Sequence, residues 1–389
     1  MVGTYRNLSL TGAFLLAVGL VAALFSSAVW ACLTAALLAI AGVVLLQGNR
    51  WRTASLLVAA LAISLAVLDA FAGFLSPTPM GRGLVRTTDP KWWPPPDPIL
   101  GFRPLPDSRV IATATFGGEP VYRTTYHFDA TAARVTPSAE AGADTYLFLG
   151  DSFTFGQGLA DDQALAAQFT KANGLKVQGI NLGVPGYAPN HLIRAFEAGL
   201  LDRYKDRNVK AVVTWIIPAQ LARTTGDGEW LGSSPRYVLE NGELRWTGTF
   251  TEYRWRNPIA GAKYLLGQQF AFINAIGMRQ RQEEQSLLFV AMMAKLQKLA
   301  REKFNAPLLI IYSWPDEQSR PDDGDSRVAH SLLLSTLQEV RKLGTPMVRV
   351  DALTTGMESA KIMIPHDGHP NAFTNGMVAG AVSRKLKLP

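Results

Sequence analysis

Two long stretches near the N-terminus carry almost no charge, and they limit the possible folds more than any other feature. Residues 12–47 hold no charged side chain, and residues 54–75 hold only Asp69. A helix needs about 20 apolar residues to cross the hydrocarbon core of a bilayer, so the first stretch fits two tightly connected spans and the second fits a third. Residues 1–76 are therefore expected to form a membrane anchor of three helices.

A cleaved signal peptide is the alternative for the first stretch, with Ser26-Ser27-Ala28 as the small-residue cleavage site. The apolar run continues to residue 47, well past that point, which favours the spans. The single cysteine, Cys32, lies inside a predicted span, so no disulfide is available to indicate the redox compartment.

The charges that flank the spans predict the orientation of the chain. Arg6 precedes the first span, and Arg50 and Arg52 lie between the second and the third. Positive charge marks the cytoplasmic side of a membrane protein. We therefore expect a multi-pass protein of the plasma (inner) membrane, with everything after about residue 76 on the periplasmic or extracytoplasmic side.

The remaining charge argues against a nucleic-acid partner. Of the net charge of +7, residues 1–80 contribute three arginines and one aspartate, or +2, which leaves +5 for the other 309 residues. That density is too low for an electrostatic nucleic-acid surface. We also find no cluster with metal-ligand spacing and no glycine loop that would cradle a phosphate, so neither a metal nor another cofactor is expected.

Residues 77–98, which follow the anchor, are rich in proline and tryptophan. The run Trp92-Trp93-Pro94-Pro95-Pro96-Asp97-Pro98 favours an extended, semi-rigid spacer, whose paired tryptophans would rest at the membrane surface. Two β-rich runs around Gly117-Gly118 predict a hairpin over residues 109–127.

From residue 144 onward, strand patterns alternate with helix patterns. Strands are expected at 145–149, 177–183, 210–217, 307–313 and 347–352, and helices at 162–172, 190–204, 284–303, 327–343 and 372–386. This alternation predicts an α/β fold, in which a parallel sheet carries helices on both faces.

Residues 224–283 interrupt the alternation as an insertion. Residues 236–246 predict a hairpin with Asn241-Gly242 at its turn. The insertion also contains three aromatic residues that could stack on sugar rings, although aromatic residues in an insertion also form small cores: Trp246, Tyr253 and Trp255.

The stretch "YLFLGDSFTFGQGL" (146–159) places a serine directly after a buried strand. Ser152 would lie at the carboxyl end of that strand, where open α/β sheets bind their ligands. A serine hydroxyl becomes a nucleophile when a base takes its proton and an acid orients that base. Among the five histidines, only those of "IPHDGHPNAFTNG" (364–376) lie in a loop with a carboxylate, and we expect this loop, after an apolar strand region, to bring Asp367 and His369 to the edge of the sheet that holds Ser152.

Three blocks of the chain resemble those of the SGNH (GDSL) hydrolases. "FLGDSFTFGQGL" resembles the first block, "INLGVPGYAPNHL" (180–192) resembles the second, and "DGHPN" resembles the closing block. The resemblance covers residues 99–389 and implies a three-layer α/β/α, flavodoxin-like domain. It also implies that Ser152 is the nucleophile, His369 the general base and acid, and Asp367 the residue that orients His369. The backbone N–H groups of Ser152 and Gly186 would then form the oxyanion hole.

Two departures from the family pattern affect these assignments. The acid lies two residues before the histidine rather than three, a spacing that resembles alginate-acetylating relatives, and Asp351 is an alternative acid. The third-block asparagine is missing from "WIIPAQLAR" (215–223), where Gln220 or Arg223 is the candidate third oxyanion donor. Asp151, beside the nucleophile, suits a role in stabilising the turn.

The resemblance implies an esterase that removes acyl groups, above all acetyl groups, from cell-envelope or exported polysaccharide through an acyl-enzyme. The first alternative is a glycan O-acetyltransferase with the same triad, supplied by a partner acyltransferase in the membrane. The second is a non-catalytic module that binds glycan or belongs to a polysaccharide-export complex. The expected partners are an acylated polysaccharide or other ester and membrane lipid.

Overall fold

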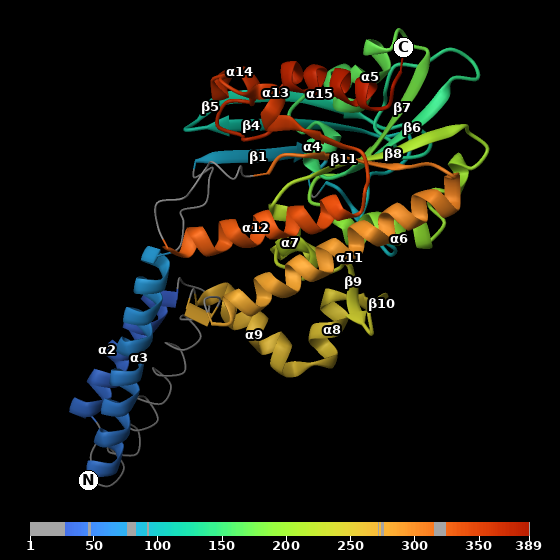
Figure 1. Ribbon diagram of the computed structural model, residues 1–389. Helices are drawn as coiled ribbons and strands as arrows, with labels where there is room; N and C mark the ends of the chain where they lie inside the picture. The colour runs from blue at the N-terminus through green and yellow to red at the C-terminus, as the bar shows by residue number, and fades with distance from the viewer. Residues whose placement is uncertain are drawn as a thin grey trace. The chain divides into compact units, whose positions relative to one another are not determined.

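The computed structural model describes residues 28–45, 48–75, 83–91, 93–270, 272–273, 276–314 and 324–388. The chain divides into two compact units (Figure 1). One contains Met1–Met80 and Arg254–Met278, and the other contains Gly81–Tyr253 and Arg279–Pro389.

A five-stranded parallel sheet forms the centre of the second unit. Its strands are β6 (Asp144–Gly150), β7 (Val177–Gly183), β8 (Val209–Ile216), β11 (Leu308–Tyr312) and β12 (Met347–Arg349). They lie in the order β12-β11-β8-β6-β7, and every neighbouring pair is parallel. Counted in chain order this is 2-1-3-4-5, the flavodoxin-like arrangement, so the prediction of a parallel α/β sheet is confirmed.

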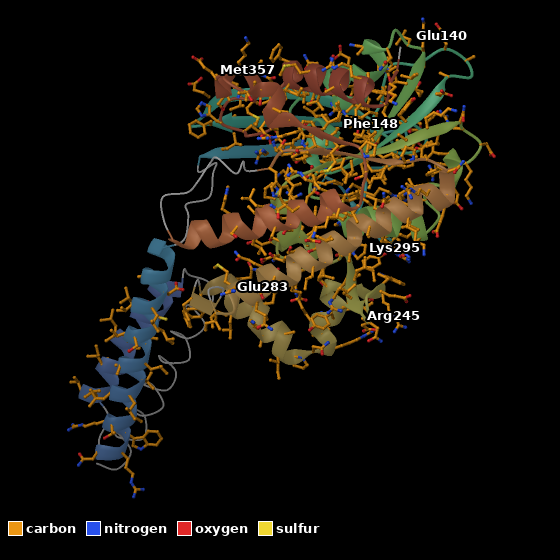
Figure 2. All side chains as sticks on the ribbon, in the orientation of Figure 1. Glu140, Phe148, Arg245, Glu283, Lys295 and Met357 are labelled. Atoms are coloured by element: carbon orange, nitrogen blue, oxygen red, sulfur yellow. The ribbon has the colours of Figure 1, made fainter. Side chains whose placement is uncertain are left out.

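Helices cover both faces of this sheet (Figure 1). On one face lie α5 (Leu165–Ala172) and α15 (Ala372–Lys385), and on the other lie α6 (Pro189–Glu197), α11 (Met278–Phe304) and α12 (Gly324–Lys342). Successive side chains of a strand point to opposite faces. Accordingly Phe148, labelled in Figure 2, packs in the α5–α15 core, whereas Leu147 and Leu149 pack in the other core.

Two predicted elements end earlier than the sequence suggests. The helix expected at 190–204 stops as α6 at Glu197. The strand expected at 347–352 stops as β12 at Arg349, and α13 (Val350–Thr354) begins at the next residue. Arg349 pairs with Tyr312, the last residue of β11. The edge strand therefore has no partner on that side beyond Arg349, and the backbone forms a helical turn instead.

A second, antiparallel sheet precedes the parallel one. It consists of β1 (Leu84–Asp89), β4 (Arg109–Phe116) and β5 (Glu119–His127) in the order β1-β4-β5. The hairpin predicted over 109–127 is β4–β5, and both Gly117 and Gly118 have positive φ at its turn.

Strand β1 corrects the spacer prediction for residues 77–98. All six residues of Leu84–Asp89 pair with β4. Farther along, β2 (Pro96–Asp97) pairs with β3 (Gly101–Phe102). The ring of Trp93 packs against Tyr126 and Phe155 at centroid distances of 5.8 and 5.6 Å, so it belongs to the domain rather than to a membrane surface. Trp92 lies outside the described residues.

The insertion contains the predicted hairpin. Strands β9 (Pro235–Glu240) and β10 (Glu243–Thr249) pair around Asn241 and Gly242, whose φ angles of 51° and 81° are those of a type I′ turn. Helices α8 (Phe250–Arg256) and α9 (Pro258–Gln269) follow.

The described residues between 28 and 75 form two helices that contact each other, α2 (Ala28–Leu45) and α3 (Asn49–Leu75). Among the described helices, α3 alone is long and apolar enough to span a membrane, over Asn49–Ala70. The apolar part of α2, Cys32–Val44, is shorter. Most of the expected first span, residues 12–27, lies outside the described residues, so the three-span, multi-pass topology stays a prediction.

Candidate functional site

Ser152 lies where the strand order of the parallel sheet reverses. It begins the short helix α4 (Ser152–Phe155) directly after β6, and β6 has β7 on one side and β8 on the other. In open α/β sheets, ligands bind in the crevice at the carboxyl ends of the strands at this switch point. The turn is tight, since a Cβ on Gly183 would come within 2.5 Å of the backbone nitrogen of Phe155.

The structure brings Ser152, His369 and Asp367 into one hydrogen-bonded series. The Oγ of Ser152 lies 2.7 Å from Nε2 of His369, and Nδ1 of His369 is hydrogen-bonded to Oδ1 of Asp367. Ser152 and His369 are 217 residues apart in the sequence. A base between a hydroxyl and a carboxylate is the arrangement that activates a serine nucleophile.

Asp367 and His369 lie in a closed loop rather than after a strand, which corrects the expected apolar strand region. The short helix α14 (Ser359–Ile362) precedes the loop, and a bridge between Met363 and Pro370 closes it. The backbone N–H of Ile364 donates to the carbonyl of His369 at 2.8 Å. The loop therefore fixes the spacing of acid and base through its own backbone hydrogen bonds.

Arg86 of β1 is a further partner of Asp367 that the sequence analysis did not identify. Its Nε donates to Oδ2 of Asp367 at 3.0 Å, and its guanidinium also donates to the Asp367 carbonyl at 3.2 Å. Burial opposes ionisation of Asp367, but the hydrogen bonds and charges of His369 and Arg86 outweigh burial and hold the pKa of this carboxyl below its usual value. Asp367 therefore stays ionised beside His369.

The β1–β4–β5 sheet touches the same loop at a second point. The ring of Phe116, at the end of β4, stacks on His366 at a centroid distance of 4.0 Å and an interplanar angle of 4°. His366, which immediately precedes Asp367, has a φ of +61°, so its backbone turns sharply there. The antiparallel sheet therefore contacts both Asp367 and the turn at His366 that positions it.

The second block lies beside the nucleophile turn. Gly150 pairs with Gly183 at the end of the β6–β7 ladder, and the N–H of Val184 donates to the Gly150 carbonyl at 3.0 Å. Gly186 follows with a φ of +88°, and a Cβ there would come within 2.8 Å of Nε1 of Trp230. The positive φ favours glycine at this position, and any larger residue would also have to displace the side chain of Trp230.

Arg223 connects the nucleophile turn to the second block. It lies on α7 (Ala219–Thr224), and one of its terminal nitrogens donates to Oδ2 of Asp151 at 2.8 Å and to the Tyr187 carbonyl at 3.0 Å. Asp151 is buried, and its other carboxylate oxygen accepts from the N–H of Phe153 at 3.0 Å. These contacts suit Asp151 to a role in stabilising the turn. They also hold the guanidinium of Arg223, the other candidate oxyanion donor, against the carboxylate of Asp151.

Gln220 is buried at the start of α7. Its Nε2 donates to the carbonyl of Trp215, near the end of β8, at 3.1 Å. Only its other N–H is left for a developing oxyanion. Gln220 as a third oxyanion donor remains a prediction.

The three aromatic residues expected to stack on sugars have different surroundings. The guanidinium of Arg194 lies 3.8 Å from the ring centre of Trp246, and that of Arg236 lies 3.7 Å from the ring centre of Tyr253. Trp255 is 82% exposed and belongs to the other compact unit.

The aromatic side chain beside Gly186 is Trp230, which the sequence analysis did not identify. Its Nε1 donates to the Gly186 carbonyl at 3.4 Å, and the side chain is half-exposed. The sequence feature that could have identified Trp230 is its position a few residues after α7, near the start of the insertion.

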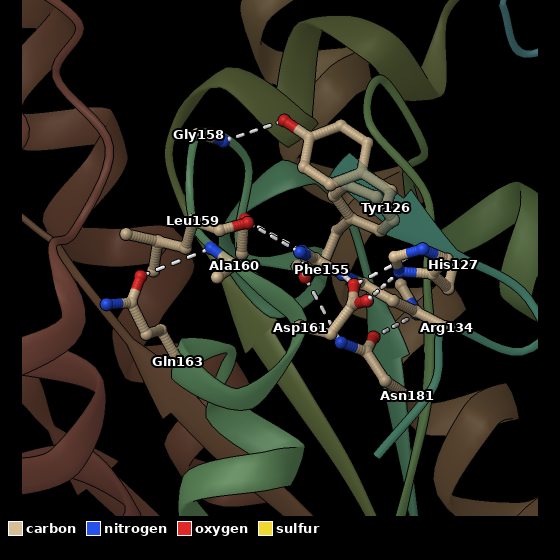
Figure 3. A network of polar contacts seen from close by, with 12 residues as sticks. Tyr126, His127, Arg134, Phe155, Gly158, Leu159, Ala160, Asp161, Gln163 and Asn181 are labelled. Atoms are coloured by element: carbon tan, nitrogen blue, oxygen red, sulfur yellow. Dashed lines mark hydrogen bonds and ion pairs between the residues drawn. The ribbon is translucent and has the colours of Figure 1, made fainter. Parts of the chain in front are cut away.

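A fully buried arginine organises the loop that follows α4 (Figure 3). The guanidinium of Arg134 donates to the carbonyls of Phe155, Gly156 and Leu159 at 2.6–2.8 Å, and its Nε donates to Oδ1 of Asp161 at 2.8 Å. Every nitrogen of this guanidinium therefore has a hydrogen-bond partner. The single side chain of Arg134 binds four residues between Phe155 and Asp161.

His191 supports the second block from inside the domain. Its Nδ1 accepts from the N–H of Ala188 at 3.1 Å, which leaves Nε2–H to donate to the Ser234 hydroxyl at 3.0 Å. Burial lowers the pKa of His191 to about 3. The imidazole is therefore neutral in the folded protein and serves the structure of the block rather than proton transfer.

We expect His191 to make the folded state sensitive to acid. In the unfolded chain its imidazole takes up a proton near pH 6.5, but the folded chain resists until about pH 3, so the unfolded state binds more protons in between. The free energy of unfolding should therefore fall, by about 2 kcal/mol between pH 7 and pH 5 from this group. Denaturant unfolding of the full chain in mild detergent at both pH values measures it.

His191→Gln is the matched control, because glutamine can accept and donate as the imidazole does but does not titrate. This variant should lose that part of the pH dependence. An identical fall in the variant and the unmodified chain would assign the effect to other groups.

The described residues hold no group of three or more histidine, cysteine, aspartate or glutamate side chains arranged to bind a metal ion. No family model matches the chain, and no curated protein matches it. Several solved structures match the chain.

One is the psychrotrophic esterase EstA from a Pseudoalteromonas species, at 13% identity and a TM-score of 0.36, with 63% of this chain and 97% of the esterase covered. Another is the acetylxylan esterase Axe2 from Geobacillus stearothermophilus, at 13% identity and a TM-score of 0.36, with 66% and 98% covered. A third is a structure described as lipolytic and of the G-D-S-L family, from Desulfitobacterium hafniense, at 12% identity and a TM-score of 0.34, with 62% and 98% covered. The chain is similar to esterases and G-D-S-L proteins.

Proposed function

We propose that this chain is a serine ester hydrolase of the SGNH type. One observation carries the proposal: Ser152, His369 and Asp367, from opposite ends of the domain, form one hydrogen-bonded series at the switch point of the sheet. The three sequence blocks support it, because each contributes to this edge.

The geometry suits a two-step reaction. Oγ of Ser152 attacks the ester carbonyl while Nε2 of His369 takes the hydroxyl proton, and Asp367 stabilises the imidazolium that forms. His369 then returns the proton to the departing alcohol. In the second step water, deprotonated by His369, attacks the acyl-enzyme and releases the acid and the free serine.

The developing oxyanion needs donors close to Ser152. The N–H of Ser152 lies in the first turn of α4, where a helix leaves backbone N–H groups without intrahelical acceptors. Gly186, in the loop bonded to Gly150, supplies the second N–H in this proposal. Such donors typically lower the barrier by about 2.7–4 kcal/mol each.

The proposed substrate is an acetyl ester on cell-envelope or exported polysaccharide. The apolar helix α3 supports a location at a membrane, and half-exposed Trp230 beside Gly186 offers a surface on which a sugar ring can stack. The orientation of the charges around the spans would place the reaction on the extracytoplasmic side.

Transfer of the acyl group to a sugar hydroxyl is the second candidate function. The Asp-x-His spacing of Asp367 and His369 favours it, because this spacing resembles alginate-acetylating relatives. The same acyl-enzyme would form from a donor supplied by a membrane partner, and the two functions would differ only in the nucleophile that attacks it.

A fluorophosphonate probe tests the proposal on the full chain in detergent micelles. One phosphonyl group should bond to Oγ of Ser152, seen as a single added mass on the Ser152 peptide, and hydrolysis of p-nitrophenyl acetate should fall in proportion. Ser152→Ala should remain unlabelled, whereas Ser313→Ala, which replaces a serine directly after strand β11 of the same sheet, should label normally.

Labelling elsewhere, or none with the folded protein, would contradict the proposal. If the serine does label, acetylated and unacetylated oligosaccharides separate the two functions. Loss of acetyl mass indicates hydrolysis, and gain of acetyl mass on the unacetylated sugar indicates transfer.

A further inference from the structure

One segment of the chain is basic and contains no acidic residue. Residues 253–282 carry Arg254, Arg256, Lys263, Arg279 and Arg281, and neither aspartate nor glutamate. It contains the end of α8, whose first turn carries Glu252, and the whole of α9, which begins at Pro258. The part Arg254–Met278 falls in the same compact unit as the apolar helices α2 and α3.

This segment exposes large apolar side chains. Ile259 is 87% exposed, Trp255 is 82% exposed and Leu265 is 66% exposed, with Leu266 also exposed. Residues three, four and seven positions apart share one side of a helix, so Ile259, Ala262, Lys263 and Leu266 lie on the same side of α9. A helix of a soluble domain normally buries large apolar side chains such as Ile259 and Leu266.

Gln268 lies on the opposite side of α9. It is nine residues from Ile259, which is two and a half helical turns, and it is also exposed. Ile259 and Gln268 are therefore both exposed, on opposite sides of α9, with Lys263 nearer to Ile259 and with Tyr264 and Leu265 nearer to Gln268. Exposed apolar area of this kind marks an interaction surface.

We propose that α8 and α9 lie in the surface of an anionic membrane, with Trp255, Ile259 and Leu266 inserted among the lipids. The excess of positive charge matches anionic headgroups, and tryptophan is favoured at the interface between headgroups and acyl chains. In α8 and α9 together, Arg254, Arg256 and Lys263 outnumber the single acidic residue, Glu252. The inference rests on the proposed membrane location, because α9 shares its unit with α3.

This placement gives Trp255 a role in lipid contact rather than in sugar stacking. It also gives the chain a membrane contact from the middle of its sequence, some 180 residues after α3 ends at Leu75. The segment between them, which contains the nucleophile, would then be attached to the membrane at both ends.

Site-directed labelling of the full chain in vesicles tests the inference. In a Cys32→Ala background, which removes the single cysteine, Ile259→Cys and Gln268→Cys are each labelled with an environment-sensitive fluorophore. The protein is reconstituted in vesicles of phosphatidylcholine and phosphatidylglycerol in equal parts, with nitroxide quenchers on the acyl chains. The label at 259 should be quenched at least about twofold more than the label at 268, because Ile259 enters the lipid in this proposal and Gln268 lies 180° around the helix from it.

A second part of the experiment varies the lipid composition. In vesicles of phosphatidylcholine alone the difference should shrink, and Arg256→Glu with Lys263→Glu should remove its dependence on the anionic lipid. Equal quenching at both positions in protein that floats with the vesicles would overturn the inference, and the surface would then serve a protein or glycan. Failure of the chain to float with the vesicles at all would instead contradict the membrane location itself.

Discussion

Ser152→Ala is expected to lower kcat for p-nitrophenyl acetate by about 10⁶-fold, and Asp367→Asn by about 10⁴-fold. The serine forms the acyl bond, so its loss leaves only the background rate. The asparagine keeps the shape of the acid but no longer fixes the tautomer of His369 that accepts the serine proton. Steady-state rates of the full chain in detergent, for single and double variants, measure both effects.

The double variant should be no slower than Ser152→Ala alone, because residues that act as one unit are not additive. Asp351→Asn is the matched control for the acid. Asp351 lies on α13 and pairs with Arg349, so its loss should leave kcat unchanged. A larger loss in Asp351→Asn than in Asp367→Asn would transfer the role of the acid to Asp351.

The alternation of apolar runs and amphipathic helices was enough to predict the parallel sheet, and with it the edge where the site forms. Strand β7 begins and ends at the residues expected, and β6 and β8 each differ from the expected bounds by one residue at both ends. Parallel strands place their carboxyl ends together, so a serine after β6 and a histidine near the last helix could be expected to meet. Local sequence sufficed here because buried strands need a continuous apolar run.

The contacts of Arg86 could not be predicted in this way. Its partner Asp367 lies 281 residues away, and neither residue carries a local pattern that marks the pair. Strand β1 is exposed along much of its length, so it lacks the apolar alternation that identifies a strand. The sequence also could not show that the amide of Gln220 would donate to the carbonyl of Trp215. These residues are close in the chain, but the contact depends on the angle at which α7 leaves β8.

Arg134→Met is expected to lower the free energy of unfolding by about 3–5 kcal/mol. Methionine fills much of the space of the arginine side chain but donates no hydrogen bond. It leaves the carbonyls of Phe155, Gly156 and Leu159 unsatisfied and removes a cation from Asp161, which keeps His127 as a partner at 2.6 Å. Denaturant unfolding of the full chain in mild detergent, followed by tryptophan fluorescence, measures the change.

Arg123→Met is the matched control, because Arg123 is exposed on β5 and its loss should change stability by no more than about 0.5 kcal/mol. Equal losses in the two variants would contradict the anchoring role of Arg134. Activity of the folded fraction then separates two consequences. If Arg134 only holds the domain together, kcat per folded molecule stays unchanged. If the loop from Phe155 to Leu159 also fixes α4, kcat falls as well, since Ser152 lies on the helix that this loop terminates.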